Sequence, residues 1–353
     1  MTTPEFLKAI TEATGVSGYE HQVRELTATE FAAYSDEIQY DSMGSVWGHK
    51  RGRGGKRRIL LAGHMDEIGL IVSRLDGHVL RFTQVGGFDV RTLPGQPVMV
   101  HGRRSLPGTV GTRPPHVVPQ EERAKVIPMT DLFIDVGLTA DELTRQVRVG
   151  DLVTVRRGYV ELRNGLVASN AMDDRAGVAA IYECLKVLSG LHHDWDVYAV
   201  ATVQEEVGLR GATTCAYCIA PDAAIAIDVT FARTPDLPEY GTVDIDKGPG
   251  IARGPNVHPV MFARLEETAK KHEIPYQVEA VPGPSGTDAW AIQVAREGIP
   301  TGLLGLPLRY MHTPTETLSL RDIERTGRLM ANFIAGLTDE FAAELTPALP
   351  EDE

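Results

Sequence analysis

The chain has 353 residues, of which 42% are hydrophobic and 24% are charged, and its formal net charge is −13. These values are typical of a globular protein with a large core, and the length suggests two domains. The charge argues against a nucleic-acid surface, no apolar run approaches the roughly 20 residues of a membrane span, and no secretory signal begins the chain. Three cysteines do not make a disulfide framework, so we expect a cytoplasmic protein.

The first part of the chain is predicted to form two helices, a hairpin and a buried strand. The second helix begins near Glu20, and the hairpin covers 37–47. Glycines interrupt the basic run at 50–58, so we interpret it as a solvated turn. Residues 58–63 form a short apolar run, which is typical of a central strand covered on both faces and which ends at His64.

The middle of the chain has a different pattern. Between about 69 and 159, short β-like segments alternate with Gly and Pro turns, which indicates a β-rich domain or barrel. We therefore expect an α/β fold whose sheet is covered by helices on both faces, with a β-rich insertion. The α/β domain would comprise 1–70 and 161–345, the insertion 71–160, and a flexible tail 346–353.

In the second half, helical and strand patterns alternate again. We expect helices at 176–188 and 288–297, strands at 197–202 and 223–227, and one closing helix at 319–345. Cys215 and Cys218 have C-x-x-C spacing, but a second pair for a zinc ribbon is missing. We interpret both as structural residues on the buried face of one helix.

Several polar residues follow the predicted strands or precede the long helix. They are His64, Asp173, Asp174, Glu205, Glu206, Asp228 and His312. Because ligands in open α/β sheets bind outside the carboxyl ends of the strands, we expect these side chains to converge. Imidazole and carboxylate ligands suit zinc or a similar divalent metal. Five such groups are too many for one open catalytic zinc but fit two ions that share one Asp.

The adjacent glutamates Glu205 and Glu206 can serve different purposes, because neighbouring residues point in different directions. One can bind a metal while the other takes a proton from a bridging water and returns it to a leaving amine. Asp66 lies two residues after His64 and could accept a hydrogen bond from the free ring nitrogen of that histidine.

Four motifs and three shorter segments carry a resemblance to a known family. The motifs are His64-Met65-Asp66-Glu67-Ile68-Gly69, Met172-Asp173-Asp174-Arg175, Glu205-Glu206-Val207-Gly208-Leu209-Arg210-Gly211 and Arg309-Tyr310-Met311-His312-Thr313, and the segments are 15–20, 111–116 and 285–289. Together they resemble the tetrahedral aminopeptidases, which are dinuclear metallopeptidases. The resemblance covers about the whole chain.

The resemblance implies a role for each candidate. Asp173 would bridge two divalent ions, His64 and Asp228 would complete one site, and Glu206 and His312 the other. Glu205 would be the general base and acid. Zinc would be the first expectation for the metal, with cobalt or manganese as alternatives. The inserted domain would be PDZ-like and would help dimers assemble into a hollow dodecamer.

The sequence thus predicts a metal-dependent aminopeptidase that hydrolyses N-terminal residues from peptides by a metal-bridging hydroxide. A deacylase or carboxypeptidase could use the same metal pair, and a non-catalytic peptide-binding scaffold is a further alternative. A glycosidase is disfavoured because adjacent carboxylates are poorly placed to flank a glycosidic bond, and the aromatic content is only 6%.

Overall fold

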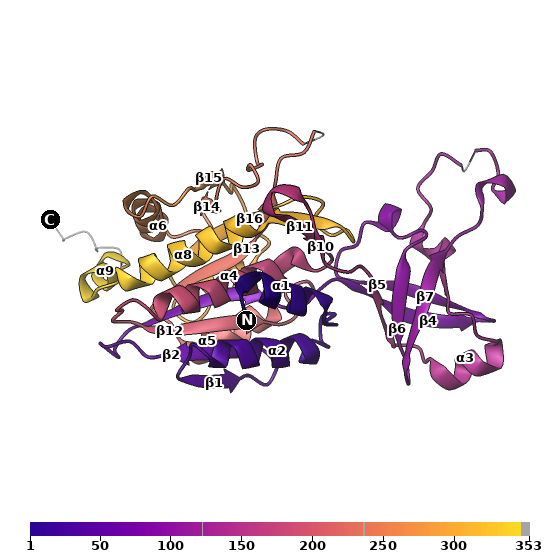
Figure 1. The fold of residues 1–353 in the computed structure, drawn as a ribbon, viewed down its shortest axis with the longest axis horizontal. Helices are drawn as coiled ribbons and strands as arrows, with labels where there is room; N and C mark the ends of the chain where they lie inside the picture. Colours follow the sequence, from indigo (N-terminus) through magenta and orange to yellow (C-terminus); the bar gives the residue numbers. More distant parts are fainter. Residues whose placement is uncertain (122, 236, 347–353) are drawn as a thin grey trace.

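The structure, a computed structural model, describes residues 1–121, 123–235 and 237–346. Figure 1 shows a helix-covered sheet on the left and a smaller β-barrel on the right. Of the predicted flexible tail, residues 347–353 lie outside the described residues. The chain is therefore a mixed α/β protein with a separate β-rich part, as the sequence predicts.

The main sheet has eight strands. In spatial order they are β1 (Glu37–Tyr40), β2 (Val46–Lys50), β12 (Asp196–Thr202), β3 (Arg58–His64), β13 (Ala223–Phe231), β16 (Thr301–Leu308), β14 (Gly250–Arg253) and β15 (Gln277–Ala280). The four central strands, β12, β3, β13 and β16, are parallel to their neighbours in that group. Their carboxyl ends therefore lie along one edge, and their continuous apolar sequences are buried.

Helices cover the sheet on both faces. One layer contains α1 (Thr3–Glu12), α2 (His21–Ala32), α4 (Met172–Leu188), α6 (Pro259–Lys271) and α8 (Leu320–Ala335), and the other contains α5 (Arg210–Ile219) and α7 (Asp288–Gln293). Gly63 lies against α4, where a Cβ would come within 3.2 Å of the Gly177 backbone. Thr202 is paired in register with His64, the residue after Gly63. Its hydroxyl donates a hydrogen bond to Asp288 of α7, in the other helix layer. No helix of the described chain is long and apolar enough to cross a membrane.

The β-rich part is a closed six-stranded barrel. Its strands, in order round the barrel, are β4 (Gly69–Asp76), β5 (Val79–Val85), β8 (Phe133–Asp135), β7 (Ser105–Gly111), β6 (Pro97–His101) and β9 (Leu152–Val155). Apolar side chains including Leu80, Val100 and Ile134 fill it, and α3 (Ala140–Gln146) packs against it. The predicted β-rich insertion is confirmed, whereas its PDZ-like character and the boundaries at 71 and 160 stay predictions.

Two short connections join the barrel to the sheet. β3 ends at His64 and β4 begins at Gly69, so the barrel leaves the sheet directly beside the first candidate ligand. The chain returns through a three-stranded sheet of β10 (Val160–Glu161), β11 (Leu166–Ser169) and β17 (Glu316–Ser319). Single turns of 3-10 helix lie at Val90–Thr92, Pro115–Val117, Met129–Asp131 and Arg163–Gly165.

Two of the predicted helices are wrong in extent. The closing helix at 319–345 is two helices, α8 and α9 (Asp339–Glu344), because Gly336 ends the first and the hydroxyl of Thr338 accepts a hydrogen bond from Phe341 N to begin the second. Helix α7 ends at Gln293 instead of 297. Arg296 then has φ 54°, which belongs to the left-handed region and cannot continue a helix.

The prediction that both cysteines of the C-x-x-C pair are buried is wrong for one of them. Cys215 is buried on α5, but Cys218 is exposed. The buried stripe of α5 contains Gly211, Ala212, Cys215, Ala216 and Ile219. A residue three positions after Cys215 therefore falls outside the stripe, and a C-x-x-C spacing on a helix does not place both thiols on one narrow face.

The sequence suggested that the strand ends before Asp228, but the structure shows that it continues past this residue. β13 continues to Phe231, because it stays paired with β16 as far as Leu308. Its pairing with β3 ends at Ala226. The two strands separate there, so Asp228 faces the open edge of the sheet from within a strand.

Candidate active site

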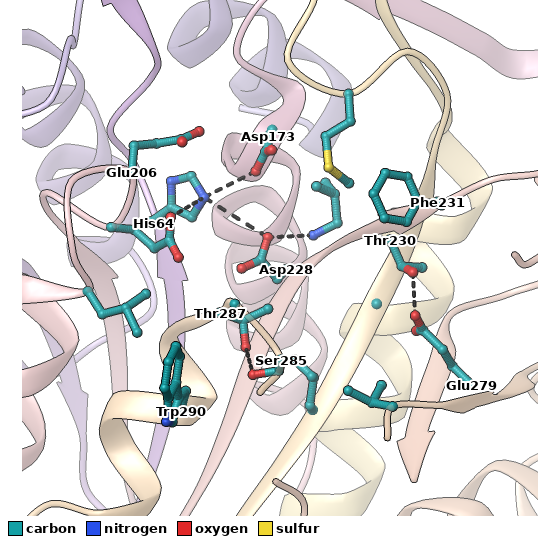
Figure 2. A pocket seen from close by; sticks show the side chains of 18 of the residues that line it. His64, Asp173, Glu206, Asp228, Thr230, Phe231, Glu279, Ser285, Thr287 and Trp290 are labelled. Carbon is teal, nitrogen blue, oxygen red and sulfur yellow. Dashed lines mark hydrogen bonds and ion pairs between the residues drawn. The ribbon is translucent and has the colours of Figure 1, made fainter. Parts of the chain in front are cut away.

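The seven polar candidates do not all play the same part, but six of them line one cavity. His64, Asp173, Glu205, Glu206, Asp228 and His312 surround a space of about 590 Å³ at the carboxyl edge of the sheet. Figure 2 shows His64, Asp173, Glu206 and Asp228 pointing toward one another in this space. Asp174, the seventh, is fully buried behind Asp173, and the peptide bond between the two is cis.

Asp173 occupies the middle of the cluster. Its Oδ1 lies 3.1 Å from Nε2 of His64, and its Oδ2 lies 3.3 Å from Nε2 of His312. The side chain comes from the N-terminal end of α4, whereas His64 is the last residue of β3 and His312 follows β16. One carboxylate thus presents one oxygen to each of two imidazoles, which is the arrangement expected of a bridging ligand.

Within the described residues, three groups of side chains could each hold a metal ion. They are His64, Asp173 and Asp228; Asp173, Glu206 and His312; and His64, Glu205 and Glu206, with the ligand atoms of each group within 4.8 Å of one another. The first two groups share Asp173 and together make the five-ligand set expected from the sequence. The third contains both glutamates, so proximity alone does not decide which of the two binds metal.

The charges of the site also suit bound cations. Burial raises the pKa of Asp228 well above its usual value, and the charge of Asp173 raises it further. Burial likewise raises the pKa of Glu205, with added repulsion from Asp228. Hydrogen bonds to Asp173 and Glu206 raise the pKa of His312 to about 11. Against the effect of burial, hydrogen bonds from His312 and His64 lower the pKa of Asp173, so this carboxylate stays ionised between two imidazoles. The other carboxylates and the two imidazoles favour their protonated forms, and divalent cations can replace those protons. The donor set fits two such ions.

Asp66 binds the backbone of the adjacent glutamates Glu205 and Glu206. Its carboxylate accepts hydrogen bonds from the Ser17 hydroxyl at 2.6 Å and from the backbone N–H groups of Glu205 at 3.0 Å and Glu206 at 3.3 Å. Nδ1 of His64 lies 3.2 Å from the backbone oxygen of Asp66 and 3.5 Å from its Oδ1. Asp66 thus orients both glutamates, and the sequence anticipated only its relation to His64.

Glu316 is a buried residue of the site that the sequence did not reveal. It accepts the backbone N–H of Asp173 at 3.1 Å and that of His312 at 2.8 Å, and it is 2% exposed. It therefore couples two of the candidate ligands from behind. The available signal was an acidic residue four positions after His312, but the pairing of β17 with β11 that buries it is a long-range contact.

Arg175 and Glu67 form a second hidden support. The guanidinium of Arg175 is fully buried and lies 3.2 Å from Oε1 of Glu67. It also donates to the backbone oxygens of Met65 at 3.0 Å and Ile10 at 2.6 Å. Both residues lie in motifs quoted above, but the sequence did not show that they meet. Their contact links the loop after His64 to the start of α4.

Comparison with known proteins gives the chain a family. A model of the M42 glutamyl aminopeptidase family matches residues 44–329, and a second model, AMPT, matches residues 2–26. The lysyl aminopeptidase of Pyrococcus furiosus is 37% identical over 331 residues, covering 92% of this chain and 94% of the relative.

Solved structures agree with the sequence matches. The crystal structure of a TET aminopeptidase from a marine-sediment Thaumarchaeota archaeon superposes with a TM-score of 0.93 at 34% identity, covering 98% of this chain and 99% of the other. The TET1 peptidase of Pyrococcus horikoshii has a TM-score of 0.84 at 33% identity, covering 95% and 100%. The resemblance to tetrahedral aminopeptidases is thereby confirmed. The chain belongs to the M42 glutamyl aminopeptidase family and is a peptide hydrolase.

Proposed function

We propose that this chain is a metal-dependent aminopeptidase that removes N-terminal residues from peptides. The observation that carries the proposal is Asp173, whose two oxygens face His64 and His312 while further carboxylates stand beside each histidine. Membership in a peptidase family disfavours the glycosidase and scaffold alternatives. A deacylase or carboxypeptidase remains the rival with the same donor set.

Five side chains would hold two divalent cations. His64, Asp173 and Asp228 would bind one, and Asp173, Glu206 and His312 the other. Such ions supply Lewis acidity, which polarises a peptide carbonyl and lowers the pKa of a water molecule. Zinc is our first candidate, and cobalt and manganese are the alternatives.

We assign the proton transfers to Glu205. Its Oε2 lies 3.8 Å from Nε2 of His64, and its backbone N–H is held by Asp66. Glu206 is the closer partner of His312, at 3.4 Å, and is the better choice of ligand. Because burial raises the pKa of Glu205, its carboxylate can accept a proton and later return it to the leaving amine.

A metal-reconstituted assay tests the function. The full chain is loaded with zinc, cobalt or manganese and assayed against a panel of aminoacyl-nitroanilides and unblocked peptides, with a chelated sample as control. We expect release of free N-terminal residues that chelation abolishes. Turnover only of N-acylated substrates, or release of C-terminal residues, would favour the rival hydrolases. No turnover with any metal would contradict the proposal.

The glutamate assignment has its own test. Glu205→Gln should keep both ions and lose about 10²- to 10⁴-fold in kcat, the usual contribution of a positioned acid or base. Glu206→Gln is the matched variant, and it should lose metal. If Glu205→Gln loses metal and Glu206→Gln keeps it, the two roles are exchanged.

For assembly, we propose a homo-oligomer built from dimers through the inserted barrel, up to a dodecamer. The proposal rests on kinship: the structure of the Pyrococcus horikoshii TET1 peptidase is described as a tetrahedron or a large octahedral shell. We also propose that residues 71–160 form a PDZ-like assembly domain. We propose the cytoplasm as the location of the protein. Light scattering of the full chain and of a variant without the barrel would test the assembly.

A further inference from the structure

One wall of the cavity is not used by the proposed chemistry. It is formed by Thr230 and Phe231 of β13 and Glu279 of β15. In the view of Figure 2, Thr230 and Glu279 lie beyond Asp228 as seen from His64. The cavity thus has an acidic group at some distance from the candidate metal ligands.

The position of the Glu279 carboxylate is well defined. The hydroxyl of Thr230 donates a hydrogen bond to its Oε1. Its Oε2 lies over two glycines, Gly250 and Gly305, where a Cβ would come within 2.9 Å and 2.8 Å of that oxygen. Any larger residue at either position would displace the carboxylate, so the glycines make the space that it occupies.

This carboxylate has no cation beside it in the described chain. Burial raises the pKa of Glu279, and the hydrogen bond from Thr230 lowers it. A half-buried acidic group of this kind is stabilised in its charged form by an opposite charge. It borders an open cavity, so a substrate can bring that charge.

The spacing fits one class of substrate residue. Asp228 and Thr230 are two residues apart on one face of β13, which corresponds to about 7 Å along a strand. An extended lysine side chain reaches roughly 6 Å from its α-carbon, since its bonds are about 1.5 Å long. Apolar residues of the same cavity, including Phe231, Leu303 and Met311, can pack against the aliphatic stem.

We propose that Glu279 selects substrates whose N-terminal residue has a cationic side chain, lysine or arginine. The inference rests on the proposed aminopeptidase function and names its substrate class. Thr230 and the two glycines position the selecting carboxylate. A glutamyl or aspartyl residue would place like charge against Glu279 and would be rejected.

The test compares two substrates that differ only in charge. Norleucine has the unbranched stem of lysine without the ammonium group. The metal-reconstituted full chain is assayed with lysyl-, arginyl-, norleucyl- and glutamyl-nitroanilide. We expect the kcat/KM of the wild type to be at least tenfold higher for lysyl than for norleucyl substrate, and Glu279→Gln to remove most of that ratio, chiefly through KM for the lysyl substrate.

Glu297→Gln is the matched control. It removes one negative charge from a side chain that is 90% exposed and outside the cavity, so it should leave the ratio as in the wild type. The ratio is measured within each protein, and turnover of norleucyl substrate by Glu279→Gln shows that the variant is folded.

The outcomes separate the inference from the function on which it rests. Cleavage of norleucyl substrate without a preference for lysine contradicts the inference and leaves the aminopeptidase function intact. An equal loss on all four substrates in Glu279→Gln also contradicts it, because Glu279 would then bind the α-amine common to them. Cleavage of none by the wild type overturns both.

Discussion

Two acidic residues on the barrel and two at the carboxyl edge of the sheet have pKa values shifted in opposite directions. On the barrel, a hydrogen bond from Arg81 lowers the pKa of Asp76, and one from Arg91 lowers that of Asp89. At the sheet edge, burial raises the pKa of Asp228 and Glu316 well above the usual range. The same residue types are paired and solvated in one region and crowded and buried in the other.

The comparison shows that polar groups needed for chemistry are buried at the sheet edge, where they lower folding stability. The barrel interior is an apolar cluster that needs no polar partners. The edge of the main sheet contains a network of carboxylates, imidazoles and one buried guanidinium, and each member depends on another. Substitutions in the network should therefore alter activity and stability together, whereas those in the barrel core should alter stability alone.

The largest expected effect comes from the buried ion pair. Arg175→Met should destabilise the fold by about 3–5 kcal/mol, because it leaves the carboxylate of Glu67 buried without a cation, with only the neutral donors of Gly15 and Asn170. Arg74→Ala breaks an exposed pair with Asp76 on the barrel and should cost at most about 1 kcal/mol. Thermal unfolding at equal protein concentration measures both. Equal losses would show that burial does not distinguish the two pairs.

A core truncation in the barrel should separate stability from activity. Leu80→Ala removes a fully buried side chain and should cost about 2–5 kcal/mol of folding free energy. Leu80 does not line the cavity, so kcat at a temperature where the variant is folded should match the wild type. A large fall in kcat of the folded variant would mean that barrel packing is coupled to the site.

The free energy of unfolding should depend on pH through the buried carboxyl group of Glu20. Burial, together with repulsion from Asp66, raises the pKa of Glu20 from 4.5 to about 7, although a hydrogen bond from the Gly18 backbone lowers it. The stability that protonated Glu20 contributes is fully present below about pH 4.5 and is lost as pH rises through 7. The loss amounts to at most about 3 kcal/mol.

Glu20→Gln is the variant that isolates this contribution, because its amide does not titrate. The unfolding free energy of the wild type minus that of Glu20→Gln should fall between pH 4.5 and pH 8, both measured with chelator. A difference that stays constant across this range would contradict the raised pKa.

The smallest expected effect concerns the support of the glutamate pair. Asp66→Asn replaces one acceptor oxygen by a donor that faces the N–H groups of Glu205 and Glu206. We expect a loss of about 10- to 100-fold in kcat with metal retained, as for other residues that orient a site. Ser17→Ala removes one hydrogen bond to the same carboxylate and should have less effect. Metal content by elemental analysis and kcat by steady-state kinetics are measured for both variants. An unchanged kcat in Asp66→Asn would contradict the orienting role of Asp66.

Local sequence determined the parts of this protein that depend on neighbours in the chain. The apolar run that forms β3 predicted a central strand, and the residues at strand ends predicted a site at that edge. It predicted less well where helices end, because Gly336 and Thr338 allow a break that the apolar periodicity does not show.

Only the tertiary structure decided which distant residues meet. Glu316 reaches Asp173 across 143 residues, and Arg175 reaches Glu67 across 108. Glu279 borders the cavity because β15 lies at the edge of the sheet beside β14, and glycines on β14 and β16 leave room for it. Such contacts depend on strand order and on close packing, and neither is encoded in the spacing of residues along the chain.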